Sequence, residues 1–145
     1  MLKLESPTEA YMLETPVEVL HRESLEWLEE IEFMKDEAAF FYGLIIRRLK
    51  TPYDPLNAEE LKSIETHLIF ISTNMLAMLH DAVVKHERYL SKMTESVKQD
   101  EQSYRSRHNG LAKKISGFEK EFKELKRKIF SVVEREVKKK KLVKK

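Results

Sequence analysis

Three of the five histidines in this sequence have spacings that could bring their imidazoles together. His108 lies in a helical seam whose other positions are Tyr, Leu, Ile and Phe. If three helices run antiparallel with short connections, residues equidistant from each connection lie at the same height. This rule places His21, His86 and His108, one on each helix, in a single layer.

A layer of three imidazoles suits a divalent first-row metal ion such as zinc, iron or copper. Glu18 precedes His21 by one helical turn and Glu87 follows His86, so both are candidate carboxylate ligands. The Glu18-x-x-His21 spacing also occurs in di-iron carboxylate bundles, but those need the motif on two helices and it occurs once here. The sequence therefore favours a metal site built from His21, His86, His108 and Glu18 or Glu87.

The alternative to this metal site is a metal-free network of buried, neutral imidazoles. Such a network would be hydrogen-bonded to the hydroxyl groups of Tyr89 or Tyr104. A single histidine in a helix seam is more often a hydrogen-bonded core residue than a metal ligand. Both hypotheses are carried forward.

A second group of candidate ligands lies farther along the first predicted helix. Glu23, Glu30 and Glu37 recur every seven residues, and His80 is expected one turn from Glu23 and Glu30. Glu30 with His80, joined by Glu23, predicts a second metal pair. The structural alternative is that these acids are solvated or pair with lysines of a neighbouring helix.

The elements that must position these residues are three long helices, predicted at residues 16–50, 57–94 and 98–138. The first has Thr15 as N-cap, Pro16 at the first helical position and Glu18 closing a capping box. A similar pattern from Asn57 predicts the second start, after Pro55. With only three Gly and four Pro in 145 residues, the sequence predicts an all-α antiparallel three-helix bundle at residues 15–138, with an arm at 1–14 and a basic tail at 139–145.

Each predicted helix has a seam of apolar residues that alternate three and four positions apart. In the first helix the seam is Val17, Leu20, Ser24, Trp27, Ile31, Met34, Ala38, Phe41 and Ile45. In the second it is Leu61, Ile64, Leu68, Ile71, Met75, Met78, Ala82, His86 and Tyr89. In the third it is Tyr104, His108, Leu111, Ile115, Phe118, Phe122, Leu125, Ile129 and Val132.

Charge is distributed unevenly along a chain whose formal net charge is only +2. Residues 1–45 have 11 acidic and 3 basic residues, a net of −8, and residues 113–145 have 14 basic and 5 acidic residues, a net of +9. We expect the first and last helices to pair through these charges. The alternative is that the Lys-rich end contacts nucleic acid or anionic lipid, although no aromatic residue among its lysines supports base stacking.

The first helix is apolar on more than one face, because Phe33, Phe40 and Leu44 lie outside its seam. Exposed together, these side chains would form a sizeable patch, so a homo-oligomer or another protein partner is expected. Residues 1–7 lack an apolar leader segment, and no uninterrupted apolar run approaches 18 residues, so a soluble, cytoplasmic protein is expected.

Common catalytic signals are missing from the sequence. It has no cysteine, which excludes thiol nucleophiles and cysteine-ligated zinc or iron–sulfur sites. It also has no Gly-rich phosphate loop and no G-x-S-x-G motif. Whether the protein is an enzyme stays open at this stage.

The stretch from Trp27 to Glu37, followed by Leu79-His80-Asp81, His86-Glu87 and His108, resembles short all-helical proteins of Bacteroidetes bacteria. The resemblance covers roughly residues 20–135 and departs from the group at His67-Leu68, where the group has His-Phe. It implies a stand-alone helical domain in the bacterial cytoplasm, and the group has no assigned activity from which a catalytic role could be transferred. The leading hypothesis is therefore a small metal-binding bundle for metal storage or redox, and its rival is a metal-free structural or protein-interaction module.

Overall fold

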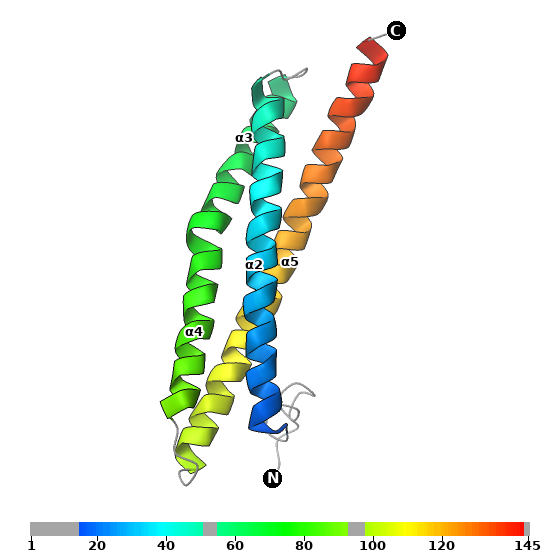
Figure 1. Cartoon of the computed structure of the whole chain (residues 1–145). Helices are drawn as coiled ribbons and strands as arrows, with labels where there is room; N and C mark the ends of the chain where they lie inside the picture. The colour runs from blue at the N-terminus through cyan, green and yellow to red at the C-terminus, as the bar shows by residue number, and fades with distance from the viewer. Residues whose placement is uncertain (1–14, 51–54, 93–97, 144–145) are drawn as a thin grey trace, which may run out of the picture. The chain divides into compact units, whose positions relative to one another are not determined.

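The computed structural model describes residues 15–50, 55–92 and 98–143, and over these residues the chain is all-α. The helices in chain order are α2 (Val17–Lys50), α3 (Pro55–Phe70), the π-helical turn η1 (Ile71–Met75), α4 (Leu76–Lys92) and α5 (Lys98–Val143) (Figure 1). The all-α prediction is confirmed. The predicted arm at residues 1–14 lies outside the described residues.

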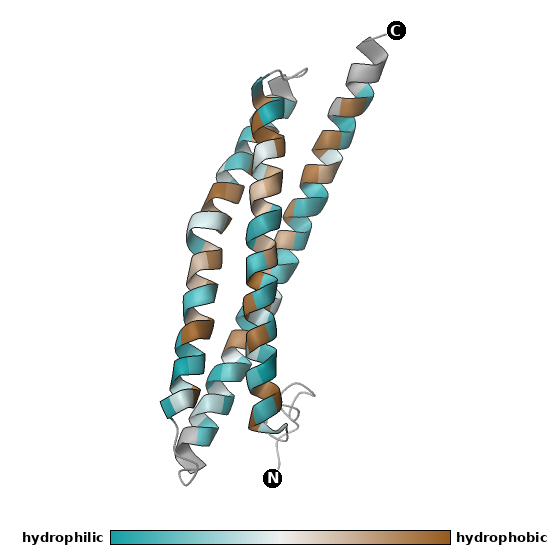
Figure 2. Ribbon diagram, in the orientation of Figure 1, coloured by the Kyte–Doolittle hydropathy of each residue, from teal (hydrophilic) through white to brown (hydrophobic). Residues whose placement is uncertain are grey.

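The contacts divide the chain into two compact units. Within the described residues, the first comprises residues 15–32, 78–92 and 98–117, and the second comprises residues 33–50, 55–77 and 118–143. Helices α2, α4 and α5 therefore contribute to both units, whereas α3 and η1 belong to the second. Along each helix, hydrophobic and hydrophilic residues alternate at helical spacing (Figure 2).

The start of the first helix agrees with its prediction, and the start of the second does not. α2 begins at Val17, and the backbone N–H groups of Val19 and Leu20 donate to the carbonyl of Pro16. α3 begins at Pro55, two residues before the predicted start, so Asn57 lies inside the first turn, where its side chain is buried. Proline suits a first helical position because its φ is already helical and its missing N–H needs no partner there.

The second predicted seam is wrong from Met75 to Ala82, because of the π-helical turn, and is correct again at His86. Ile71 is fully buried, but the next buried residues are Leu76, Leu79 and Val83, whereas the predicted Met78 is 66% exposed. The π-helical turn at Ile71–Met75 inserts one extra residue, which rotates the inward-facing positions by one. After this rotation His86 follows the buried Val83 by three residues, which is a normal helical spacing, and His86 is buried too.

The third predicted seam is buried over its whole length, and the first is buried apart from the partly exposed Val17 and Trp27. α5 starts at the predicted residue and continues past the predicted end at residue 138 to Val143. The tail boundary at residue 139 is therefore not a helix end. Contact of this basic end with nucleic acid or anionic lipid stays a prediction.

In the second unit, an aliphatic and aromatic core is flanked by ion pairs between helices. Glu37 of α2 pairs with Lys126 of α5 at 3.0 Å, as the charge distribution predicts. α3 pairs with α5 through Glu60–Arg135 at 2.7 Å and His67–Glu121 at 3.1 Å. The buried hydrophobic residues of the second unit are Met34, Ala38, Phe41, Ile45, Leu61, Ile64, Leu68, Ile71, Leu76, Phe118, Phe122, Leu125, Ile129 and Val132.

Candidate functional site

The polar core of the first unit is the strongest candidate site, because it buries two histidines among aromatic side chains. α2 supplies Ser24, α4 supplies His86, and α5 supplies Tyr104 and His108. All four side chains are at least 97% buried. Each lies on the inward face of its helix, so the same periodicity that buries leucines elsewhere positions these polar groups.

A chain of hydrogen bonds joins α2, α5 and α4 through this core. Glu23 Oε1 lies 2.9 Å from His108 Nε2, and His108 Nδ1 lies 3.0 Å from His86 Nε2. A carboxylate can only accept a hydrogen bond, so His108 donates from Nε2 to Glu23. A neutral His108 then accepts at Nδ1, and His86 must donate from Nε2. This order leaves His86 Nδ1 as an acceptor.

Stacked aromatic rings hold both imidazoles in place. The His86 ring lies almost parallel to the Tyr104 ring, with centroids 4.3 Å apart and an interplanar angle of 7°. Trp27 stacks on His108 with a centroid distance of 4.4 Å. Each ring is stacked on one aromatic side chain and held by the hydrogen bond between the two imidazoles, so the network helps to set the relative positions of the three helical segments in this unit.

Burial keeps both imidazoles neutral. It lowers the pKa of His86 to about 4, and the nearby charges of His108 and Arg107 act in the same direction. Burial also lowers the pKa of His108, although its hydrogen bond to Glu23 opposes the effect. The pKa of the Tyr104 hydroxyl is raised, first by burial and then by the charge of Glu87. At pH 7 the network therefore consists of neutral rings beside a carboxylate.

Some polar atoms of this core have no hydrogen-bond partner among the described residues. They are His86 Nδ1, the Tyr104 hydroxyl and Glu87 Oε1 in the network, with Asn109 Oδ1 on the same helix as Tyr104. An unpaired buried polar group costs roughly 1–3 kcal/mol. The core of this unit is thus less stable than an apolar core of the same volume would be.

The structure brings together only part of the predicted metal-ligand set. His86 and His108 meet directly, whereas His21 pairs with Glu87, and Glu18 is exposed at the start of α2. Over residues 15–50, 55–92 and 98–143, no group of three or more His, Asp or Glu side chains is placed to hold a metal ion. The metal site therefore stays a prediction.

The members of the second predicted site have separate surroundings. Glu23 accepts the hydrogen bond from His108, which the sequence reasoning did not anticipate. Glu37 belongs to the second unit and pairs with Lys126. His80 lies 3.8 Å from its neighbour Asp81, and Glu30 is exposed. The contact of Ser24 was also missed: its hydroxyl oxygen lies 3.5 Å from His108 Nδ1, and a serine in an otherwise apolar seam was the signal for it.

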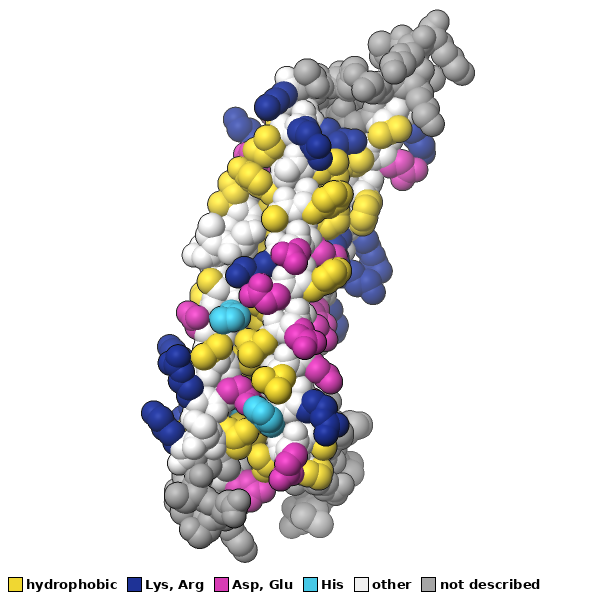
Figure 3. Space-filling model, viewed as in Figure 1, with side chains coloured by type: hydrophobic (Ala, Val, Ile, Leu, Met, Phe, Trp, Pro, Cys, Tyr) yellow, Lys and Arg dark blue, Asp and Glu magenta, His cyan; other side chains and the backbone are white. Residues whose placement is uncertain are grey.

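The second unit carries a different kind of candidate site, an exposed aromatic patch formed by Phe33, Phe40 and Phe130. Their side chains are 64%, 62% and 59% exposed. Phe40 and Phe130 each pack edge-on against the buried Phe41, with centroid distances of 5.5 Å, so the patch joins α2 to α5. Hydrophobic side chains reach the surface between charged ones (Figure 3).

One further apolar feature bears on the location of the protein. Within the described residues, the helical stretch Asn57–Lys92 is long and apolar enough to cross a membrane, with a mean hydropathy of 1.3 over its best 18 residues. A core helix of a soluble protein passes the same test, so this evidence is weak, and cytoplasmic location stays a prediction.

Comparison with known proteins does not assign this chain to a family. No protein-family model matches it, and no curated protein or solved structure matches it either. The functional argument therefore depends on the residues and their geometry alone.

Proposed function

We propose that this protein is a self-associating, antiparallel three-helix bundle whose partner is a second copy of the same chain. The pairings support the antiparallel order. From Glu37 to Phe41 in α2, the partner in α5 moves forward from Lys126 to Phe130, which supports a parallel order of these two helices. From Glu60 to His67 in α3, the partner in α5 moves back from Arg135 to Glu121, which supports an antiparallel order. A short connection between consecutive antiparallel helices gives this order.

The observation that carries the proposal is the aromatic patch of Phe33, Phe40 and Phe130. Fully burying a Phe side chain removes about 150–250 Å² from water, so three that are about 60% exposed present roughly 300 Å². That area is typical of a functional apolar patch on a monomer. Aromatic side chains of this kind supply most of the binding energy at the centre of protein interfaces.

The charge distribution favours a second copy over an unrelated partner. The N-terminal 45 residues have a net charge of −8 and the C-terminal 33 residues a net charge of +9. In a two-fold symmetric pair, each acidic segment can face the basic segment of the other chain. In addition, residues 66–80 contain no Asp, Glu, Lys or Arg while exposing Ile69 and Phe70, so this stretch presents no like charge to a second copy.

The histidine network has a specificity role in this proposal. An apolar seam tolerates a slip of one helix past another more readily than a seam with a hydrogen-bonded pair does. The contacts of His108 with Glu23 and His86 exist in one register only, because a slip leaves buried polar atoms unpaired. The network thus favours one register of the helical segments in the first unit.

Sedimentation velocity over a concentration series tests the proposal. We expect the wild-type mass to rise toward that of a dimer, and the double variant Phe40→Glu/Phe130→Glu to stay monomeric. Leu25→Glu is the matched control, because Leu25 is also exposed, at 45%, but lies outside the patch in the first unit. A wild-type protein that is monomeric at its highest soluble concentration, or that inserts into lipid vesicles, would overturn the proposal.

A second candidate function is binding of zinc, iron or copper, and one feature favours it. Glu23 accepts from His108 Nε2 and thereby directs Nδ1 toward His86, the arrangement in which a carboxylate orients a metal-binding imidazole. Two nitrogens bound to one tetrahedral zinc ion lie about 3.3 Å apart. His86 Nε2 and His108 Nδ1 are separated by a similar distance, 3.0 Å. Glu87, with one buried unpaired oxygen, is the candidate third ligand.

Elemental analysis of protein purified without a His-tag tests the metal candidate. Near-stoichiometric zinc, iron or copper that is lost in His108→Leu and kept in His80→Leu supports it, because His80 lies outside the network. Absence of metal after supplementation removes it and leaves the self-association proposal unchanged.

A further inference from the structure

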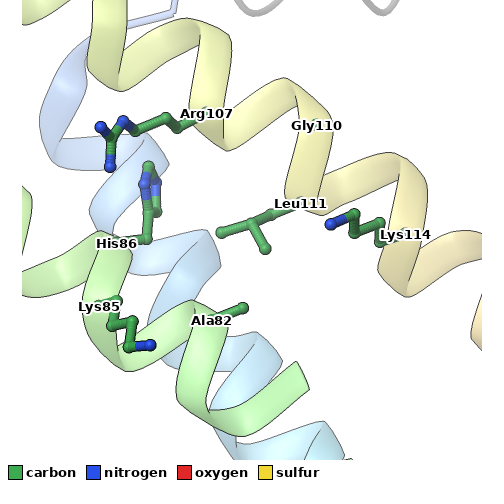
Figure 4. A pocket seen from close by; sticks show the side chains of 7 residues that line it. All are labelled: Ala82, Lys85, His86, Arg107, Gly110, Leu111 and Lys114. Carbon is green, nitrogen blue, oxygen red and sulfur yellow. The ribbon is translucent and has the colours of Figure 1, made fainter. Parts of the chain in front are cut away.

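An open cavity in the first unit lies between α4 and α5, next to the histidine network. Its volume is about 260 Å³, and Figure 4 shows the side chains around it. α4 contributes the face that carries His86, and α5 contributes the opposite face. The lining residues are Ala82, Lys85, His86, Arg107, Gly110, Leu111 and Lys114.

The charges around this cavity are all positive. Lys85, Arg107 and Lys114 line it, and it has no acidic lining residue. Among the described residues, no ion pair joins a carboxylate to any of these three side chains. The Arg107 guanidinium lies over the Tyr89 ring, 4.3 Å from its centroid. These three exposed cations lie around one hollow and give it a positive potential, which attracts an anion.

The rest of the lining is apolar and leaves room for carbon atoms. Leu111 and Ala82 form part of it, and Gly110 adds space because an added Cβ there would meet no atom within 4 Å. His86, which is 97% buried, closes the cavity with a neutral ring. At about 260 Å³ the cavity is below the size typical of drug-sized ligands, so its occupant is a small molecule.

We propose that this cavity binds a small organic anion with a short apolar tail. Lys85, Arg107 and Lys114 hold the carboxylate through charge-assisted hydrogen bonds, and the tail lies against Leu111 and Ala82. The site is separate from the aromatic patch of the second unit, so it does not depend on self-association.

Octanoate is the probe, and titration calorimetry with NMR of the His86 ring is the measurement. We expect wild-type protein to bind octanoate with a shift of the His86 ring signals, and Lys85→Gln/Lys114→Gln to weaken binding by about tenfold or more. Lys113→Gln is the charge control, because it removes an exposed lysine of α5 that does not line the cavity.

A filled-cavity variant makes the test independent of charge. Gly110→Leu places a side chain in the cavity and should abolish binding, whereas Gly117→Leu on the same helix should leave it unchanged. Both variants should fold at least as well as wild type, because leucine favours a helix over glycine. Absence of octanoate binding, equal binding of neutral octanol, equally tight binding of inorganic phosphate, or equal loss in the two glycine variants would overturn the proposal.

Discussion

The two units bury different kinds of side chain, although the same helices pass through both. The second unit has an interior of aliphatic and aromatic residues, where Asn57 is the one buried polar side chain among the described residues. The first unit has Thr15, Ser24, His86 and His108 buried in its interior. The second unit gains stability from burial of apolar area, while the first spends stability on polar contacts that specify one arrangement.

This difference shows how a repetitive seam obtains a unique register. Apolar seams with regular spacing fit together in more than one register. A shift of one helix along its neighbour by one turn places another apolar side chain at each contact. A pair of hydrogen-bonded imidazoles stacked on Tyr104 and Trp27 fits in one way. The predictions below test this contrast, from the largest expected effect to the smallest.

The largest effect should come from the apolar interior of the second unit. Phe122 is 99% buried, and Phe122→Ala should lower the free energy of unfolding by about 3–5 kcal/mol, because it removes apolar contacts and leaves a cavity. Urea denaturation followed by circular dichroism measures this loss. A change below about 1 kcal/mol would mean that the second unit is not the more stable part.

Acid should lower the stability of the first unit. The pKa of His86 is lowered to about 4 from 6.5, so the unfolded chain binds more protons than the folded one between these values. Stability is therefore full above pH 6.5 and is lost as the pH falls toward 4, by at most about 3 kcal/mol. The lowered pKa of His108 acts in the same direction.

Thermal denaturation at pH 7 and pH 4.5 measures this dependence. The wild-type melting temperature should fall by roughly 10 °C, and His86→Leu/His108→Leu should fall by much less because both titrating rings are gone. His80→Gln is the control, and it should behave as wild type because His80 is partly exposed and outside the network. Equal falls in wild type and the double variant would contradict this account.

A double-mutant cycle measures the coupling of the two imidazoles. His108→Leu removes the acceptor of His86 Nε2 and should cost about 2 kcal/mol, because a buried donor is left unpaired. The double variant His86→Leu/His108→Leu should cost less than the sum of the single variants by about 1–2 kcal/mol. Simple additivity of the three free energies of unfolding, measured in urea, would argue against a direct hydrogen bond.

The smallest effect should be a gain in stability. The hydroxyl of Tyr104 is buried without a partner among the described residues. Tyr104→Phe keeps the ring that stacks on His86 and removes the unpaired hydroxyl, so it should stabilise the protein by up to about 1 kcal/mol. If the variant is instead destabilised, the hydroxyl hydrogen-bonds to Ser24 or Glu87, the two side chains whose hydrogen bonds act on the pKa of Tyr104.

Residue periodicity was sufficient to predict the helices and most of the buried seams. The third seam, from Tyr104 to Val132, is buried at each predicted position, and α5 begins at the predicted residue. The helix-breaking proline was equally informative, since α2 ends at Lys50, ahead of Pro52. These features are local, because helix spacing and proline geometry depend on nearby residues only.

Tertiary structure decided what the local pattern could not. The π-helical turn at Ile71–Met75 buries Leu76 in place of Met75 and Met78, since packing against other helices outweighs the regular helical repeat. The pairing of Glu23 with His108 joins residues 85 positions apart. By itself the sequence determined which residues face inward along most of each helix, because that follows from 3.6 residues per turn. The partner of each inward polar group depends on contacts between helices, which only the folded chain provides.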